Sequence, residues 1–178
     1  MPTYPGDPVA SLKQVAFVGK DGYADHALAT TMHVGTHIDA PAHMIEGGKK
    51  IHELPLALFS GVGIVMDARD KQELSIELAA RPSLTESKVQ PYPIVLFCTA
   101  FSKYYRHDSG KYFSDYPVMT EALARELIRL KVKLIGLDTP SPDRPPFAVH
   151  KILLGAGIPI IENLTNLEEL LSVLSFDI

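Results

Sequence analysis

A run of histidines around residue 40 has the residue types and the spacing to bind a metal ion. Residues 33–43 read HVGTHIDAPAH, and five of the seven histidines in the chain fall between positions 26 and 52. Gly35, Pro41 and the β-branched residues disfavour a helix here, whereas side chains of an extended chain alternate between two faces. His33, His37 and Asp39 would then share one face, with the β-branched residues between them pointing into the core. Nitrogen and oxygen donors of this kind suit zinc, manganese or iron.

The elements around this run are expected to alternate strands with helices, which is typical of an α/β domain. Strands are predicted at Gly63–Asp67, Ile94–Thr99, Leu134–Leu137 and Pro159–Glu162, and at Gln14–Val18 within an otherwise irregular region 1–25. Helices are predicted at 73–80, from an N-cap at Thr120 to about Leu130, at Ala148–Leu154, and after Thr165, where Glu168 completes a capping box. Residues 102–117 are predicted to form a long loop whose aromatic side chains either line a pocket or pack on the domain.

Composition narrows the class of protein. The chain has 178 residues with 46% hydrophobic and 21% charged residues, which predicts a single globular domain over residues 1–178. A net charge of -4 without basic clusters argues against nucleic acid as a partner. We expect neither a signal peptide nor a membrane span, because no apolar run approaches the roughly 20 residues that a span needs. The single cysteine, Cys98, is expected to be buried and reduced, so a cytoplasmic location is predicted.

The histidine run resembles the His-x-Gly-Thr-His-x-Asp-x-Pro-x-His motif of the cyclase family of metal-dependent hydrolases, which includes bacterial kynurenine formamidases and isatin hydrolases. The resemblance extends over most of the chain. Tyr4-Pro5-Gly6-Asp7 matches an N-terminal aromatic-Pro-Gly-Asp element, and residues 136–143 match a Gly-x-Asp-x-x-Ser-x-Asp stretch. His150 and the segment 161–167 match the C-terminal ligand region. Family members continue into further strands, so we expect the C-terminal strands to be missing or rebuilt here.

This resemblance implies a swivelling β/β/α domain, a homodimer and a divalent metal centre, zinc or else manganese, with one or two ions per chain. His33, His37, Asp39 and Glu162 would bind one ion, while Asp39 and Glu162 would bridge to a second ion held by His150. His43 would be the acid/base. Tyr4 stands where kynurenine formamidases carry a tryptophan that packs on the substrate, so it is either a substrate contact or part of a Pro-Gly turn.

The implied chemistry is hydrolysis of a small-molecule amide. A metal ion lowers the pKa of water toward about 7, and a histidine with an ordinary pKa near 6.5 suits proton transfer to the leaving nitrogen. A Gly-x-Ser-x-Gly elbow is absent, which disfavours a serine nucleophile. N-formylkynurenine is one candidate substrate. Two alternatives stay open: a hydrolase of cyclic amides such as isatin, and a metal-binding relative without turnover.

Overall fold

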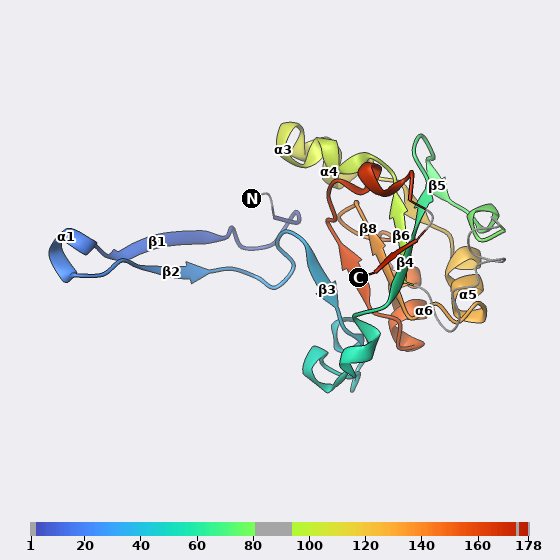
Figure 1. Ribbon diagram of the computed structural model, residues 1–178, viewed down its shortest axis with the longest axis horizontal. Helices are drawn as coiled ribbons and strands as arrows, with labels where there is room; N and C mark the ends of the chain where they lie inside the picture. Colours follow the sequence, from blue (N-terminus) through green and yellow to red (C-terminus); the bar gives the residue numbers. More distant parts are fainter. Residues whose placement is uncertain (1–2, 81–93, 174, 178) are drawn as a thin grey trace.

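A six-stranded mixed sheet forms the centre of the molecule, with the strand order β10-β4-β6-β8-β9-β3 (Figure 1). The computed structural model describes residues 3–80, 94–173 and 175–177. The four inner strands run parallel, and the outermost strands β10 and β3 are antiparallel to their neighbours. The strands are β3 (His37–Asp39), β4 (Val62–Asp67), β6 (Ile94–Cys98), β8 (Leu134–Leu137), β9 (Ile160–Glu162) and β10 (Phe176–Asp177).

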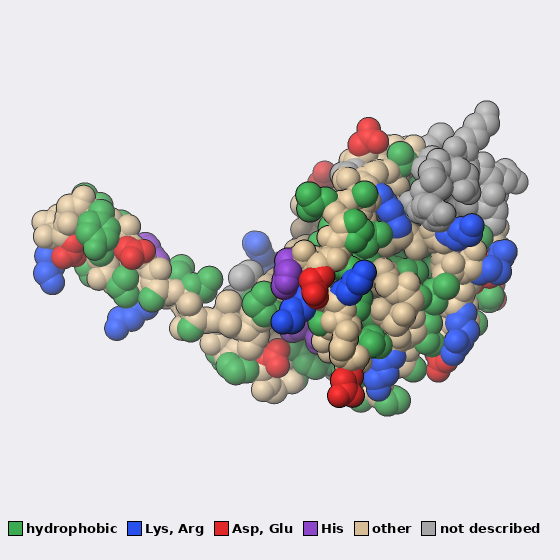
Figure 2. All heavy atoms as spheres, turned by 90° about the horizontal axis from the view of Figure 1, so that it is seen from below, with side chains coloured by type: hydrophobic (Ala, Val, Ile, Leu, Met, Phe, Trp, Pro, Cys, Tyr) green, Lys and Arg blue, Asp and Glu red, His purple; other side chains and the backbone are tan. Residues whose placement is uncertain are grey.

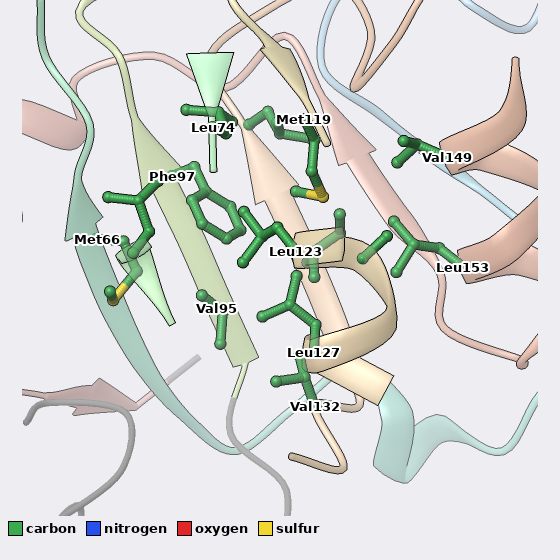
Figure 3. Close-up of a cluster of buried hydrophobic side chains, with 14 of the residues drawn as sticks. Met66, Leu74, Val95, Phe97, Met119, Leu123, Leu127, Val132, Val149 and Leu153 are labelled. Atoms are coloured by element: carbon green, nitrogen blue, oxygen red, sulfur yellow. The ribbon is translucent and has the colours of Figure 1, made fainter. Parts of the chain in front are cut away.

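Hydrophobic side chains cover both faces of this sheet, as the continuous apolar runs predicted. On one face, α5 (Glu121–Arg129) and α6 (Ala148–Gly155) pack on the strands through a core that includes Phe97, Leu123 and Leu153 (Figure 3). On the other face, Ile94, Leu96 and Cys98 pack with the C-terminal segment. The predicted α/β class and the predicted burial of Cys98 are confirmed. No helix in the described ranges has the length and hydrophobicity of a membrane span.

A long hairpin projects from this body (Figure 1). It consists of β1 (Ser11–Ala16), the short helix α1 (Val18–Asp21) and β2 (Asp25–Ala29), and within the described part of the chain these two strands pair only with each other. We call residues 8–32 the arm. The predicted strand at Gln14–Val18 overlaps β1, but its bounds were wrong and the region is less irregular than predicted, because cross-strand pairing such as Leu12 with Leu28 extends the strand toward the N-terminus.

Two other predicted elements differ in kind. The predicted helix at 73–80 is instead β5 (Glu73–Leu74) and a 3-10 turn (Ile76–Leu78), because Leu74 pairs in parallel with Met119 of β7 (Val118–Met119). The predicted loop 102–117 contains a 3-10 turn (Phe101–Lys103) and two short helices, α3 (Tyr104–His107) and α4 (Ser109–Ser114). Asp108 caps α4 by accepting a hydrogen bond from the Lys111 amide, and burial of Tyr112 fixes this helix.

The C-terminal helix is also shorter than predicted. It is a 3-10 turn (Leu167–Leu170) whose N-cap is Asn166, in a left-handed conformation and without a side-chain cap hydrogen bond. The capping box from Thr165 to Glu168 was therefore wrong. In contrast, Thr120 caps α5 as predicted, accepting a hydrogen bond from the Leu123 amide at 3.1 Å.

Candidate metal centre

Strand pairing at one edge of the sheet brings the first two donors together. β3 runs antiparallel to β9, and the register places His37 opposite Glu162 and Asp39 opposite Ile160. As a result, His37 Nε2 lies 3.3 Å from Glu162 Oε2, although 125 positions separate the two residues. The antiparallel ladder therefore joins the histidine motif to the C-terminal carboxylate.

The extended conformation predicted for residues 33–39 holds only for the last three residues. Gly35 has a φ of +71°, so the chain turns before β3 begins. His33 still reaches the cluster through this turn, with Nδ1 3.0 Å from Asp39 Oδ1. The expectation that the intervening residues point into the core was wrong, because β3 is the outermost strand of the sheet: Thr36 is exposed and Ile38 is 39% exposed.

The first turn of α6 delivers His150. Asp143, in the preceding proline-rich loop, accepts hydrogen bonds from the Val149 amide at 2.6 Å and from the His150 amide at 3.4 Å, which anchors the helix start. The same carboxylate contacts His150 Nδ1 at 2.6 Å. Because Asp143 accepts the Nδ1 proton, Nε2 is the nitrogen that faces Asp39 and Glu162, at 3.6 and 3.2 Å.

The donor atoms lie at the separations that a metal ion imposes. Ligand atoms about 2.1 Å from a tetrahedral ion are about 3.4 Å from one another. The separations in the structure are 3.0 Å from His33 to His37, 3.5 Å from His37 to Asp39 and 3.2–3.6 Å from His150 to the two carboxylates. Among the described residues, two groups of donors could hold an ion: His33 with His37 and Asp39, and Asp39 with His43 and His150. Asp39 belongs to both groups.

Unpaired buried oxygens also fit a cation. Both carboxylate oxygens of Asp39 and Oε1 of Glu162 are buried without a hydrogen-bond partner among the described residues. Leaving a buried charged oxygen unpaired costs several kcal/mol, so such atoms are rare unless an ion or water satisfies them. The residues present therefore fit a divalent metal ion, which would be held between two carboxylates and several imidazoles.

The electrostatics of the cluster favour positive charge. Burial alone would lower the pKa of His37, but the negative carboxylates of Asp39 and Glu162, which face its Nε2, outweigh burial and raise the pKa to about 10. For His150, burial again lowers the pKa, but the hydrogen bond to Asp143 and the nearby carboxylates of Asp39 and Glu162 outweigh burial and raise the pKa to about 11. Despite its burial, Asp39 has a pKa well below the usual range because of the surrounding histidines. His43 differs, since burial and the neighbouring His33 and His150 lower its pKa although Asp39 opposes them.

A pocket of about 230 Å³ opens onto this cluster. Its polar floor includes His33, His43, His150 and Glu162, and its wall is largely apolar. Three aromatic side chains contribute to the wall: Tyr4, Phe113 and Phe147. Tyr4 contacts Phe113 edge-on, with ring centroids 5.7 Å apart. The space suits one aromatic ring with a small polar substituent, because an apolar cavity of about 150 Å³ already holds benzene.

The structure brings all of the predicted site residues to this one place. His33, His37, Asp39, His150 and Glu162 converge, His43 Nε2 lies 4.0 Å from Asp39 Oδ2, and Tyr4 lines the pocket. Their individual roles stay predictions. Sequence reasoning did not single out Phe147 and Asn163 in the pocket wall, and it gave Asp143 no role beyond a motif match. The position of Asn163 directly after Glu162 was the one available signal.

A family model with the description "Putative cyclase" matches residues 1–144. The chain belongs to the cyclase family. This confirms the family predicted from the histidine motif. A kynurenine formamidase of Bacillus cytotoxicus is 28% identical over 166 residues, which cover 90% of this chain and 75% of that protein.

Two solved structures share the fold. A predicted metal-dependent hydrolase from Bacillus stearothermophilus is 26% identical with a TM-score of 0.66. The match covers 92% of this chain and 79% of the hydrolase chain. Isatin hydrolase A from Labrenzia aggregata is 24% identical with a TM-score of 0.78. The match covers 95% of this chain and 76% of the isatin hydrolase chain. The swivelling β/β/α fold and the enzyme class, a hydrolase of the cyclase family, agree with the predictions.

Proposed function

We propose that this cyclase-family enzyme hydrolyses the carbon–nitrogen bond of a small aryl amide, with arylformamides as the first class to test. One observation carries the proposal: a cluster of histidines and carboxylates forms the floor of a pocket with an aromatic wall and room for about one ring. The kynurenine formamidase among its relatives supports the same class of substrate. Tyr4 would pack on the aromatic part of the substrate from its place beside Phe113.

The proposed metal ligands are His33, His37, Asp39, His150 and Glu162. A divalent ion, zinc or manganese, would supply Lewis acidity there, lowering the pKa of water and polarising the amide carbonyl. Asp39 contributes to two donor groups, which supports a centre with room for two ions as well as for one. The carboxylates of Asp39 and Glu162 balance the positive charge within a largely apolar surrounding.

His43 is the proposed acid/base. Its side chain is 28% exposed, it lines the pocket, and its lowered pKa leaves the imidazole neutral at neutral pH, so that it can accept a proton. In the proposed reaction it takes a proton from the attacking water, and the carbon–oxygen bond forms. It then returns that proton to the departing nitrogen as the carbon–nitrogen bond breaks, which releases the acid and the amine.

The deciding experiment combines elemental analysis of purified protein with turnover assays on open-chain formanilides and on cyclic amides. We expect a bound transition metal and cleavage of formanilide. His43→Ala should lower kcat by roughly 10²–10⁴-fold while metal content is retained. His52→Ala is the matched control, because His52 is exposed and outside the cluster.

Other outcomes would replace the proposal. Preference for cyclic amides would identify a ring-opening hydrolase, and bound metal without turnover would identify a binding protein that has lost catalysis. Unchanged turnover of the His43→Ala variant would remove His43 from the mechanism.

We further propose that the enzyme is a homodimer whose arm packs on a second copy of the chain. Apart from Ala16, β1 and β2 are exposed throughout, and two-stranded hairpins are marginally stable in water by themselves. The arm also carries eight large apolar side chains that are at least half exposed (Figure 2); they are Val9, Leu12, Val15, Phe17, Val18, Tyr23, Leu28 and Met32. Its two lysines balance its two aspartates, so two arms would not repel one another.

A cytoplasmic location is proposed from the single, buried cysteine.

A further inference from the structure

Three hydrogen bonds fix Asn163, a residue that lines the pocket. It has a φ of +57°, a left-handed conformation that asparagine tolerates better than most residues. Its backbone N–H donates to the Thr139 carbonyl at 3.0 Å, and its backbone carbonyl accepts from the Thr36 hydroxyl at 2.7 Å. The backbone of Asn163 is therefore tied both to the loop after β8 and to the segment that carries His33 and His37.

The side chain of Asn163 is oriented by Tyr112. The Tyr112 hydroxyl donates to Asn163 Oδ1 at 2.9 Å, and the next nearest acceptor, the Asp138 carbonyl, lies at 3.4 Å. Tyr112 is 1% exposed and packed among Phe101, Tyr105 and Phe113, and burial raises its pKa, so its hydroxyl stays protonated and keeps this geometry. With Oδ1 occupied, the Nδ2 group is the part of the amide that remains for a ligand.

We propose that Asn163 Nδ2 donates a hydrogen bond to the acyl oxygen of the amide substrate, and that Tyr112 is the positioning residue that orients it. Asn163 lines the pocket directly beside Glu162, and no described group accepts a hydrogen bond from Nδ2. This inference rests on the proposed function, since it concerns the oxygen that any amide substrate must bring to the floor of the pocket.

Such a donor would act on kcat because the negative charge on the acyl oxygen develops only during the reaction. When water adds to an amide carbonyl, the acyl oxygen gains negative charge, and a fixed donor binds this oxygen more strongly than the neutral carbonyl. Asn163 would need little reorganisation, because its backbone and its Oδ1 are already bonded. The contribution is therefore expected mainly in the transition state, with a small effect on KM.

Asn163→Gly is the informative variant, because glycine adopts the positive φ without strain while the side chain, with its amide, is removed. On formanilide we expect kcat to fall roughly 100-fold with KM within threefold of the wild type. Asn163→Asp, which replaces the donor by an acceptor, should lose as much, and Tyr112→Phe should lose several-fold in kcat. Asn166→Gly is the matched control: Asn166 has a φ of +61° and lies outside the pocket.

A binding measurement separates a catalytic contact from a structural one. Phenyl phosphonamidate carries tetrahedral anionic oxygens like those of the intermediate, and its affinity for the metal-loaded Asn163→Gly protein should be roughly 100-fold lower. Metal content and the melting temperature should match those of Asn166→Gly.

The two possible failures are distinguishable. Wild-type protein that cleaves no amide would overturn the proposed function, and the role of Asn163 with it. If the wild type cleaves amides and the kcat of Asn163→Gly is within threefold of the wild-type value, this inference alone would be overturned. Asn163 would then serve only to adopt the left-handed backbone conformation at this position.

Discussion

Single side chains set the chemistry of the candidate centre by controlling what their neighbours present. Asp143 shows this most clearly: one carboxylate accepts from the Val149 amide in the first turn of α6 and also accepts the Nδ1 proton of His150, so the helix start and the proposed ligand are fixed together. A histidine that binds a metal through one nitrogen commonly donates the other to a carboxylate, which fixes the tautomer and the ring orientation. The acidic residue in the loop therefore belongs to the centre, although it does not face the proposed ion.

Replacing Asp143 should weaken the binding of metal. Asp143→Asn loses the charge that stabilises the Nδ1–H tautomer of His150, and we expect the affinity for Zn²⁺ to fall 10–100-fold. Competition with a fluorescent chelator measures this change. Glu121→Gln on α5, an exposed residue, is the control. Equal affinities in the two variants would show that His150 needs no such partner.

At the scale of elements, short turns rather than long helices position the site. The 3-10 turn Pro41–His43 follows β3 directly and aims His43 at the cluster. This turn lies against Gly48: a Cβ at Gly48 would come within 2.7 Å of the Pro41 carbonyl carbon and 2.9 Å of the Ala42 amide nitrogen. The glycine is thus required because two pieces of backbone touch.

Gly48→Ala should disturb stability and site together. The added methyl must push residues 41–42 away, which we expect to cost about 1–3 kcal/mol of unfolding free energy and to lower kcat by moving His43. Urea unfolding and turnover assays check both effects. Gly19→Ala in the arm is the control, since a Cβ there meets nothing within 4 Å. A Gly48→Ala protein with wild-type stability would contradict the close contact.

The two predicted N-caps give a second comparison between elements. Thr120→Ala should destabilise the protein by about 1 kcal/mol, because the Leu123 amide loses its hydrogen bond and α5 packs in the core. Thr165→Ala should change the free energy of unfolding by less than about 0.5 kcal/mol, because Thr165 caps no helix in the structure. Chemical denaturation of both variants tests this difference. Equal losses of unfolding free energy would show that Thr165 does cap the C-terminal segment.

At the scale of the whole molecule, the arm is the feature that a single copy leaves unexplained. It carries several exposed apolar side chains, yet it stands away from the sheet and its core (Figures 1 and 2). It leaves and rejoins the body between Asp7 and His33, which both line the pocket. Packing of the arm on a second copy would therefore connect the dimer to the entrance of the site.

Two charges on the arm should dissociate the proposed dimer. Leu12 and Leu28 are cross-strand partners, so Leu12→Asp with Leu28→Asp places two carboxylates side by side on the surface expected to be buried. We expect wild-type protein to have the mass of a dimer in light scattering at micromolar concentration and the double variant that of a monomer. Ile76→Asp, at an exposed apolar residue outside the arm, should remain dimeric. Monomeric wild-type protein would refute the dimer.

The sequence by itself determined the donors and most of the sheet. His33, His37, Asp39 and His43 lie in one short motif whose residue types limit the chemistry, and the apolar runs that form β4, β6, β8 and β9 are buried whichever neighbour they pair with. Local spacing carries this information, because ligand chemistry and burial depend on residue type and on near neighbours.

Only the tertiary structure decided how distant segments meet. The pairing of His37 with Glu162, the contact between Asp143 and His150, and the orientation of Asn163 by Tyr112 each join residues through register or packing. The same holds for Leu74, whose pairing with Met119 replaced a locally plausible helix by a strand. Such contacts depend on the energy of the whole fold, which no single segment of sequence contains.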